Sequence, residues 1–380
     1  MNFLFASDSF KGTLSSEKII ELLTVEAKKV FPDCTTKGVL IADGGEGTVD
    51  TVIKNTKGKI IKLDVYGPLM EKCDSYYGEI NKDSAIIEMA AASGLPMVPI
   101  EKRNPLNTST YGTGELIKAT LDKGFHDITI AIGGSATNDG GMGAMIALGI
   151  KFLDANGNEL KGTGSDLEKV HDIDLSKIHP SITKTKFTVM CDVNNPLTGE
   201  RGATYTFGKQ KGGTPEILDR LEKGMKNYAK VLLEKTGVDV DKIAGSGAAG
   251  GLGAALCIFL NATLKSGIET VLDLIEFDSL LKDIDLVITG EGRIDWQSAF
   301  GKVPSGIGNR CKTKNIPVIA IVGGMGDGAQ DIYEHGVESI ITTVNCDMEL
   351  NEALNRAEEL YIDASGRTFR LLKVGMTIKK

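Results

Sequence analysis

The sequence has little of what marks several large classes of protein. Its six cysteines lie far apart along 380 residues, without the paired spacing of a zinc site or a redox motif. No apolar run approaches the ~20 residues that a membrane span needs. Basic residues are not gathered in any stretch, which disfavours nucleic acid and anionic membranes as partners. We therefore expect a protein that binds neither nucleic acid nor a membrane.

The start of the chain also lacks a secretion signal. Its first residues read MNFLFASDSFKG, and the charges of Asp8 and Lys11 come too early for the apolar segment of a signal peptide. Together with the isolated cysteines, this predicts a cytoplasmic protein in a reducing compartment.

Common catalytic motifs are absent as well. No stretch has the Walker A spacing, the kinase catalytic-loop or DFG signature, or the Gly-x-Ser-x-Gly elbow of many hydrolases. The four histidines lie in polar contexts near the ends of expected elements, which is typical of surface residues. Any phosphoryl transfer by this chain must therefore use a different phosphate-binding loop.

Glycine is what the sequence has in abundance. It holds 46 glycines, a share well above the usual ~7%, and they fall in clusters directly after apolar runs. Apolar residues make up 41% and charged residues 25%, with a net charge of −8, as is ordinary for a globular protein. A chain of this length predicts two domains.

Apolar strands alternate with helices at both ends of the chain. Expected strands, each leading into a helix, cover residues 2–6, 38–42, 286–288, 318–322 and 340–344. They predict a doubly wound parallel α/β sheet, for which we expect strand order 2-1-3-4-5. That order would place residues 7–12 and 290–295 on opposite sides of a crevice at the switch point. Residues 1–62 and 283–380 would then form one discontinuous domain.

The middle of the chain, residues 63–282, is expected to be a second α/β domain inserted into the first. Residues 60–66 and 75–80 alternate like antiparallel strands, whereas 85–92 (AIIEMAAA) fits either a buried strand or a helix. Further along, we expect helices at 114–123 and 215–235 and strands at 128–132 and 187–191.

Residues 133–141 (GGSATNDGG) form the best candidate for a phosphate-binding loop. Glycines expose backbone N–H groups, polar side chains add donors, and a helix N-terminus follows. The nucleotide-binding residues predicted from this loop are Gly133, Gly134, Ser135, Asn138 and Asp139. The alternative is a glycine-rich turn whose polar side chains cap its own backbone. A second run, 245–250, matches a dinucleotide fingerprint only weakly, and a packing role is favoured there.

Acidic residues end several of the expected strands. Asp43 and Asp192 follow strands directly, and Asp295 follows one after a loop. Strand-end carboxylates can hold Mg²⁺ with its waters or accept a hydroxyl proton, although each alone is more often a turn or capping residue. We predict metal ligands among Asp43, Glu46 and Asp192.

Seven motifs spread along the chain form a recognisable set. They are DSFKGTLS (8–15), ADGGEGT (42–48), IGGSATNDGG (132–141), CDVNNPLTGERGAT (191–204), FGKQKG (207–212), GAAGGLGAAL (247–256) and TGEGRID (289–295). Together they resemble the bacterial glycerate kinase family, type 1, from the first expected strand to the last helix. The resemblance implies phosphorylation of D-glycerate by ATP with Mg²⁺, typically giving 2-phosphoglycerate. It also implies a flavodoxin-like domain paired with an inserted α/β domain.

The chain departs from the family's pattern just after Asp295. Where the family usually has Gln-Thr before a residue pair and Gly-Lys, this sequence has Trp296, Gln297 and Ser298 ahead of Ala-Phe-Gly-Lys. Because serine keeps the hydroxyl, we expect the chemistry to be retained, with the fit of the substrate as the point of difference.

Roles within such an enzyme follow from the chemistry of its anionic substrates. Basic side chains would neutralise and position both of them, and Arg293 could grip a carboxylate through two hydrogen bonds. Asp295 is the first choice for the base that accepts the hydroxyl proton. The predicted catalytic residues are Lys11, Asp192, Asp295 and Lys302, and the predicted substrate-binding residues are Ser9, Gly292 and Arg293.

Other functions stay open at this point. One is a glycerate 3-kinase, or a kinase or phosphatase for another small hydroxy acid. Another is a non-catalytic binding protein for small acids, since two α/β domains also describe solute binders. The clusters of acids, bases and glycines would be superfluous in a pure binder, which favours the enzyme. Assembly into a homo-oligomer also stays open.

Overall fold

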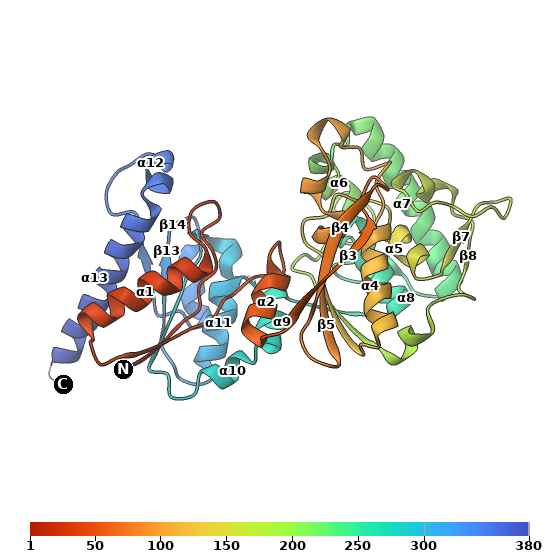
Figure 1. The fold of residues 1–380 in the computed structure, drawn as a ribbon. Helices are drawn as coiled ribbons and strands as arrows, with labels where there is room; N and C mark the ends of the chain where they lie inside the picture. Colours follow the sequence, from red (N-terminus) through yellow and green to blue (C-terminus); the bar gives the residue numbers. More distant parts are fainter. Residues whose placement is uncertain (300, 379–380) are drawn as a thin grey trace. The chain divides into compact units, whose positions relative to one another are not determined.

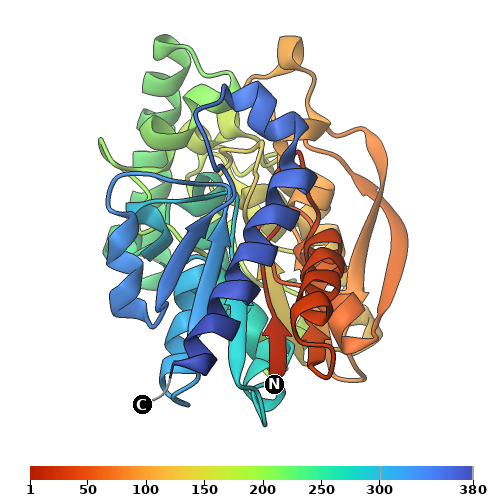
Figure 2. The same ribbon diagram turned by 90° about the vertical axis from the view of Figure 1, so that its left-hand side faces the viewer.

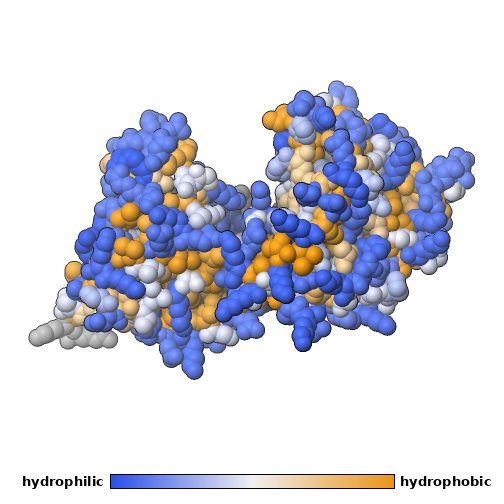
Figure 3. Space-filling view, in the orientation of Figure 1, coloured by the Kyte–Doolittle hydropathy of each residue, from blue (hydrophilic) through white to orange (hydrophobic). Residues whose placement is uncertain are grey.

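The chain folds into two compact units in the computed structural model, which describes residues 1–299 and 301–378 (Figure 1). Unit 1 comprises Met1–Asp43, Lys54–Thr56 and Gly267–Lys380, and unit 2 comprises Gly44–Ile53 and Lys57–Ser266. Hydrophilic residues cover most of the surface of each unit on the face drawn in Figure 3. No helix in the described ranges is both long and apolar enough to cross a membrane.

Unit 1 is built on a parallel sheet with the order β2-β1-β11-β13-β15. Its strands are β1 (Asn2–Phe5), β2 (Thr35–Gly38), β11 (Leu286–Thr289), β13 (Val318–Val322) and β15 (Ser339–Thr342). Numbered along the chain, this order is 2-1-3-4-5. β1 and β11 lie side by side with Phe3 opposite Leu286, so the two strands expected to flank the switch point are neighbours. The α/β fold class with parallel sheets is confirmed.

Helices cover both faces of this sheet. They are α1 (Ser16–Val30), α9 (Gly267–Leu274), α10 (Phe277–Leu280), α11 (Val303–Lys312), α12 (Leu350–Asn355) and α13 (Ala357–Thr377). α1 and α13 lie together on one face (Figure 2), where Phe3, Phe5 and Phe369 form an aromatic cluster. α1 begins at Ser16 because the preceding residue, Ser15, caps the helix by accepting a hydrogen bond from the Lys18 N–H.

The second strand was predicted too late in the chain. It was expected at 38–42, but β2 covers Thr35–Gly38, and its residues are mostly exposed at the edge of the sheet. The apolar run 39–42 instead enters the following loop, where Val39 and Ile41 are buried. An edge strand packs against fewer neighbours and therefore needs fewer apolar residues. The apolar run thus corresponds to the loop that enters the core, and the strand lies just before it.

Unit 2 contains a mixed sheet with the order β10-β9-β6-β5-β4-β3. Its strands are β3 (Lys59–Tyr66), β4 (Lys72–Glu79), β5 (Ser84–Glu88), β6 (Asp127–Ala131), β9 (Lys186–Met190) and β10 (Thr263–Lys265); β7 (Lys151–Leu153) and β8 (Asp172–Asp174) form a separate pair. β3, β4 and β5 are antiparallel, and the remaining pairs in the sheet are parallel. The segment 85–92, ambiguous in sequence, forms most of a strand and then the short helix α3.

The helices of unit 2 pack on this sheet around a large apolar core. They are α3 (Ala90–Ser93), α4 (Tyr111–Lys123), α5 (Met142–Ala147), α6 (Ala203–Phe207), α7 (Pro215–Thr236) and α8 (Leu252–Leu260), and α2 (Thr48–Thr56) begins in this unit. α7 shows how the sequence sets its ends: Thr214 caps it, Pro215 occupies its first turn, and Gly237 ends it in a left-handed conformation.

The expected domain division, 1–62 with 283–380 against 63–282, differs from the compact units by three segments, the first of which is residues 44–53 of unit 2. Residues 57–62 lie within unit 2, because β3 pairs with β4 along its whole length. Residues 267–282 lie within unit 1, where Ile268 of α9 packs against Gly306 of α11.

Candidate active site

A pocket of about 710 Å³ lies at the carboxyl ends of β1 and β11 in unit 1. Two loops that leave these strands are held together, because the Asp8 N–H donates to the Gly290 carbonyl oxygen at 2.9 Å. Only glycine fits at position 290, because a Cβ there would overlap the Ile321 carbonyl oxygen. The buried strand Leu286–Thr289 thus delivers its glycine loop directly into the pocket wall.

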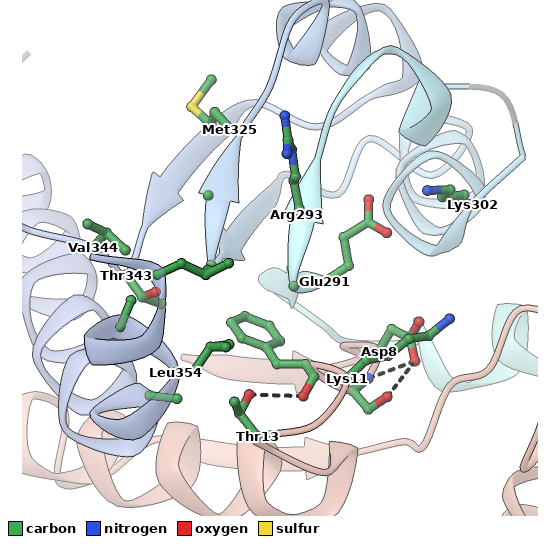
Figure 4. A pocket seen from close by; sticks show the side chains of 18 of the residues that line it. Asp8, Lys11, Thr13, Glu291, Arg293, Lys302, Met325, Thr343, Val344 and Leu354 are labelled. Atoms are coloured by element: carbon green, nitrogen blue, oxygen red, sulfur yellow. Dashed lines mark hydrogen bonds between the residues drawn. The ribbon is translucent and has the colours of Figure 1, made fainter. Parts of the chain in front are cut away.

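The lining of the pocket divides into two chemically distinct parts. We call the first the polar part; it consists of Asp8, Ser9, Lys11, Asp43, Glu291, Arg293 and Lys302. The second, the apolar part, consists of Met325, Val344, Met348, Leu350, Ala353, Leu354 and Ala357. Figure 4 shows Met325, Val344 and Leu354 on one side of the pocket, and Lys302, Lys11 and Asp8 on the other.

Six predicted site residues therefore meet in one place: Ser9, Lys11, Asp43, Gly292, Arg293 and Lys302. They come from four different segments of unit 1, which the parallel sheet brings to the same edge. Three cations in one pocket make an environment suited to a phosphate or a carboxylate.

Asp8 is the first site residue that sequence reasoning missed. Burial raises its pKa to about 6, and the neighbouring charge of Asp43 adds to the shift. The Ser9 N–H donates to Asp8 at 2.7 Å and acts in the opposite direction. The sequence does contain a sign of this residue, because Asp8 follows the first strand in a loop that is rich in polar residues.

Glu291 is the second residue that sequence reasoning missed. Its side chain is buried at 7% exposure, and one oxygen, Oε1, has no hydrogen-bond partner among the described residues. Burial raises its pKa to about 7, while the Ser298 hydroxyl and Lys302 hold the shift back. A carboxyl group with this pKa can exchange a proton near neutral pH.

Asp295 and Arg293 share one short stretch of chain but differ in position. β12 (Arg293–Ile294) pairs with β14 (Gly324–Met325), which presents Arg293 to the pocket. Asp295 is not among the described residues that line it. Its N–H donates to the Ser298 hydroxyl at 3.2 Å, and the Ser298 N–H donates to its carbonyl oxygen at 2.9 Å, so its backbone closes a turn.

The remaining predicted residues lie in unit 2. Asp192 is exposed just after β9, and Glu46 is exposed in the loop before α2. That loop is fixed by Glu88, which accepts hydrogen bonds from the N–H groups of Gly47 and Val49 at 3.2 and 3.4 Å. Burial raises the pKa of Glu88 while these hydrogen bonds oppose the shift.

The glycine loop 133–141 turns most of its polar side chains into unit 2. Asp139 is buried and accepts hydrogen bonds from the N–H and hydroxyl of Thr110 at 2.7 and 2.8 Å. Asn138 donates to the Thr204 hydroxyl at 3.1 Å. Of the five predicted nucleotide-binding residues, Gly133 and Gly134 are the two that are not buried. The side chains of Asn138 and Asp139 therefore shape the loop, and contact with a nucleotide stays a prediction for its glycines.

Lys211 is a further residue that sequence reasoning did not single out, although its motif was noted. Its amino group is buried and donates to the Ser135 hydroxyl at 2.8 Å and to the Thr137 carbonyl oxygen at 2.7 Å. Burial lowers the pKa of Lys211 to about 7. The side chain thus holds the glycine loop from the inside.

A metal ion here would need ligands from a substrate or from water in addition to protein side chains. The described residues contain no group of three or more His, Cys, Asp or Glu side chains able to hold one. Mg²⁺ in phosphoryl-transfer sites is commonly held by one or two carboxylates together with substrate phosphates. Asp8 and Asp43, close enough for the charge of one to raise the pKa of the other, fit that mode of binding.

Comparisons with known proteins identify the family to which this chain is similar. The sequence model of the "Glycerate kinase family" matches residues 3–373. "Glycerate kinase" of Bacillus subtilis is 44% identical over 97% of this chain and 96% of its own. "Glycerate 2-kinase" of Escherichia coli is 44% identical over 99% of both chains.

A solved structure extends the similarity to the fold. The crystal structure of a putative glycerate kinase 2 from Salmonella typhimurium has a TM-score of 0.88 at 42% identity, covering 100% of both chains. The resemblance read from the seven motifs is therefore confirmed. The chain is a kinase that belongs to the glycerate kinase family.

Proposed function

We propose that the protein transfers the γ-phosphoryl group of ATP to D-glycerate and releases 2-phosphoglycerate and ADP. The observation that carries this proposal is the polar part of the pocket, where three cations face carboxylates whose pKa values are raised toward neutrality. The name of the Escherichia coli relative, "Glycerate 2-kinase", supports the choice of the 2-hydroxyl.

The cations bind and orient the two anions. Arg293 presents a planar guanidinium that can grip the glycerate carboxylate through two hydrogen bonds. Lys11 and Lys302 line the same pocket and compensate the charge that spreads over the transferred phosphoryl oxygens. Ser9 and Gly292 complete the substrate side of the pocket.

Glu291 is our candidate for the group that accepts the proton of the attacking hydroxyl. It lines the pocket, and its pKa of about 7 suits proton acceptance near neutral pH. Asp295, the choice made from the sequence, and Asp192 remain alternative candidates for this role. Kinetics of the single variants distinguish them, as described below.

Mg²⁺ would be held by Asp8 and Asp43 of the pocket together with the ATP phosphates. Bound there, it supplies positive charge to the phosphate oxygens. Glu46 and Asp192, predicted from the sequence as further ligands, belong to unit 2. In the same unit, the backbone of Gly133 and Gly134 remains the predicted contact for phosphate.

The test is an assay of the purified protein with D-glycerate, ATP and Mg²⁺. ADP should appear in step with 2-phosphoglycerate, which is identified by ³¹P NMR or by direct conversion with added enolase. L-glycerate serves as the control substrate. A product that enolase does not convert would identify a 3-kinase, and ligand binding without ADP would identify a binding protein. Cytoplasmic location and homo-oligomerisation remain predictions, tested by cell fractionation and by analytical ultracentrifugation.

A further inference from the structure

The apolar part of the pocket has no task in the reaction of glycerate itself. It exposes large side chains to water: Met325 is 48%, Leu354 45% and Leu350 72% exposed. These residues come from β14 and α12, and all three line the pocket. Large apolar side chains grouped in a concave site usually mark a surface that a ligand covers.

The volume of the pocket also exceeds what glycerate needs. Pockets of ~300–1,000 Å³ bury drug-sized ligands, and this one measures about 710 Å³. Glycerate is a three-carbon acid with a charged group and two hydroxyls, so it gains nothing from contact with methionine and leucine. A larger ligand with one apolar end and one strongly anionic end would match both parts at once.

We infer that the apolar part binds the purine and ribose of ATP, with the triphosphate directed to Lys11 and Lys302 of the polar part. This inference rests on the proposed function, because it takes ATP as the phosphoryl donor. It assigns the nucleoside to the pocket of unit 1.

Charge complementarity within one continuous cavity supports this occupant. Arg293 and Glu291 lie between Met325 and Lys302 in Figure 4, so the apolar part merges directly into the charged one. Flexible, polarisable methionine side chains adapt to the face of an aromatic ring. A purine placed against them would leave its phosphates on the cationic side.

Gly324 provides a second, independent sign of free space in this region. It lines the pocket, and a Cβ built on it would meet no atom within 4 Å. Its backbone does not have the positive φ that only glycine adopts easily. A side chain at this position would therefore fill space without straining the strand.

The experiment compares Leu354→Glu with Leu233→Glu as a matched control. Both leucines lie on helices and are 45% exposed, but Leu233 belongs to α7 of unit 2 and does not line the pocket. The measurements are the Kd of MgATP by calorimetry, the KM values of MgATP and D-glycerate, and the binding of adenosine by saturation-transfer NMR. Adenosine has no phosphates, so it reports the apolar part alone.

Leu354→Glu should raise the Kd and KM of MgATP about tenfold or more, because it removes an apolar contact and adds negative charge near a triphosphate. It should also abolish the adenosine signal and change the KM of glycerate by less than about twofold. Leu233→Glu should behave as wild type. Gly324→Val should reproduce the loss of MgATP affinity by steric exclusion, which keeps the test valid if one variant misfolds.

The outcomes separate this inference from the proposed function. If the wild type turns over glycerate while both variants keep the wild-type KM for MgATP, the nucleoside binds elsewhere and the inference is wrong. If glycerate affinity falls as much as that of MgATP, the apolar part is not a nucleoside site. If Leu354→Glu changes only the mass of the assembly, the surface is a subunit interface and the inference is again wrong. If the wild type binds MgATP but does not phosphorylate glycerate, the proposed function is wrong. Loss of MgATP binding in Leu354→Glu and Gly324→Val would then still support the inference.

Discussion

Replacing Glu291 with glutamine should lower activity and raise stability at the same time. The substitution keeps the shape of the side chain but removes its charge and its capacity to accept a proton. If Glu291 accepts the hydroxyl proton, kcat should fall by ~10²–10⁴-fold, the usual contribution of a positioned general base. The limb of the wild-type pH profile that rises as pH passes about 7 should disappear in the variant.

The effect on stability follows from the same buried carboxyl group. Its pKa is raised from 4.5 to about 7 by folding, so the folded protein binds more protons than the unfolded chain between these values. Stability therefore falls as pH rises through this window. A shift of this size corresponds to roughly 3–4 kcal/mol at most, at ~1.4 kcal/mol for each pH unit. Glutamine, which is never ionised, should not lose this stability.

The assay is thermal unfolding of ligand-free wild type and Glu291→Gln from pH 4.5 to pH 8, beside steady-state kinetics. The Tm difference in favour of the variant should grow with pH and level off above about 7. Glu334→Gln, at an exposed glutamate of the same unit, is the control and should leave both properties unchanged. A Tm difference independent of pH would contradict the burial argument, and near-normal kcat would assign proton acceptance to another residue.

Four further predictions concern neighbouring groups. Arg293→Ala should raise the KM of glycerate far more than that of ATP, by roughly 10–150-fold for a charged hydrogen bond of ~1.5–3 kcal/mol; equal changes in steady-state KM for both substrates would rule out a carboxylate clamp. Asp295→Asn should change kcat by less than about tenfold because the side chain is not among those that line the pocket; a loss of ~10²-fold in the same assay would return the role of base to Asp295. Lys211→Met should lower the free energy of unfolding by ~1–3 kcal/mol, since the Ser135 hydroxyl and the Thr137 carbonyl lose their donor; urea denaturation with unchanged stability would contradict this. Trp296, the sole tryptophan and 54% exposed, lies on the loop that carries Arg293, so its emission should change with saturating glycerate; constant fluorescence during measurable turnover would mean that the loop does not respond to the substrate.

The parallel sheet of unit 1 was predictable because its central strands are short apolar runs that are followed within three residues by glycine or aspartate. Such runs occur where both faces of a strand are covered, as for Leu286–Thr289. The edge strand β2 was not located correctly, because Thr35–Gly38 is mostly exposed and carries no apolar signal. The apolar pattern of a sequence indicates which positions are buried, so it does not locate a strand that is exposed to solvent.

The polar part of the pocket was largely predictable, whereas the apolar part was not. Lys11, Arg293 and Lys302 stand out in sequence as charges among glycines after strands, and a parallel sheet must bring such loops to one edge. Met325 and Leu354 look like ordinary core residues, and only their exposure in the structure separates them from the core. Glu291 was not predicted as a candidate base for a related reason, since its raised pKa comes from burial that the sequence does not display.

The glycine loop 133–141 shows a different limit of the sequence. Its composition fits a phosphate cradle and a self-capping turn equally well. The role of each residue depends on its hydrogen-bond partners in the folded protein. Asp139 accepts a hydrogen bond from Thr110, and Lys211 donates one to Ser135 from a segment more than seventy positions away. No local pattern records such a partner.

The pairing of β1 with β11 has a consequence for how the protein is made. Asn2 hydrogen-bonds to Asp285, 283 positions further along the chain, so the first strand leaves the ribosome long before its central partner exists. At synthesis rates of ~5–20 residues per second, that interval lasts roughly 15 to 60 s. During it, unit 2 can fold as soon as its last strand emerges, while the apolar segment Asn2–Phe5 can meet only β2 and α1 among its early neighbours. The nascent chain therefore carries an aromatic strand that lacks its central partner for most of its synthesis, which makes this segment the expected binding site for chaperones that recognise apolar stretches.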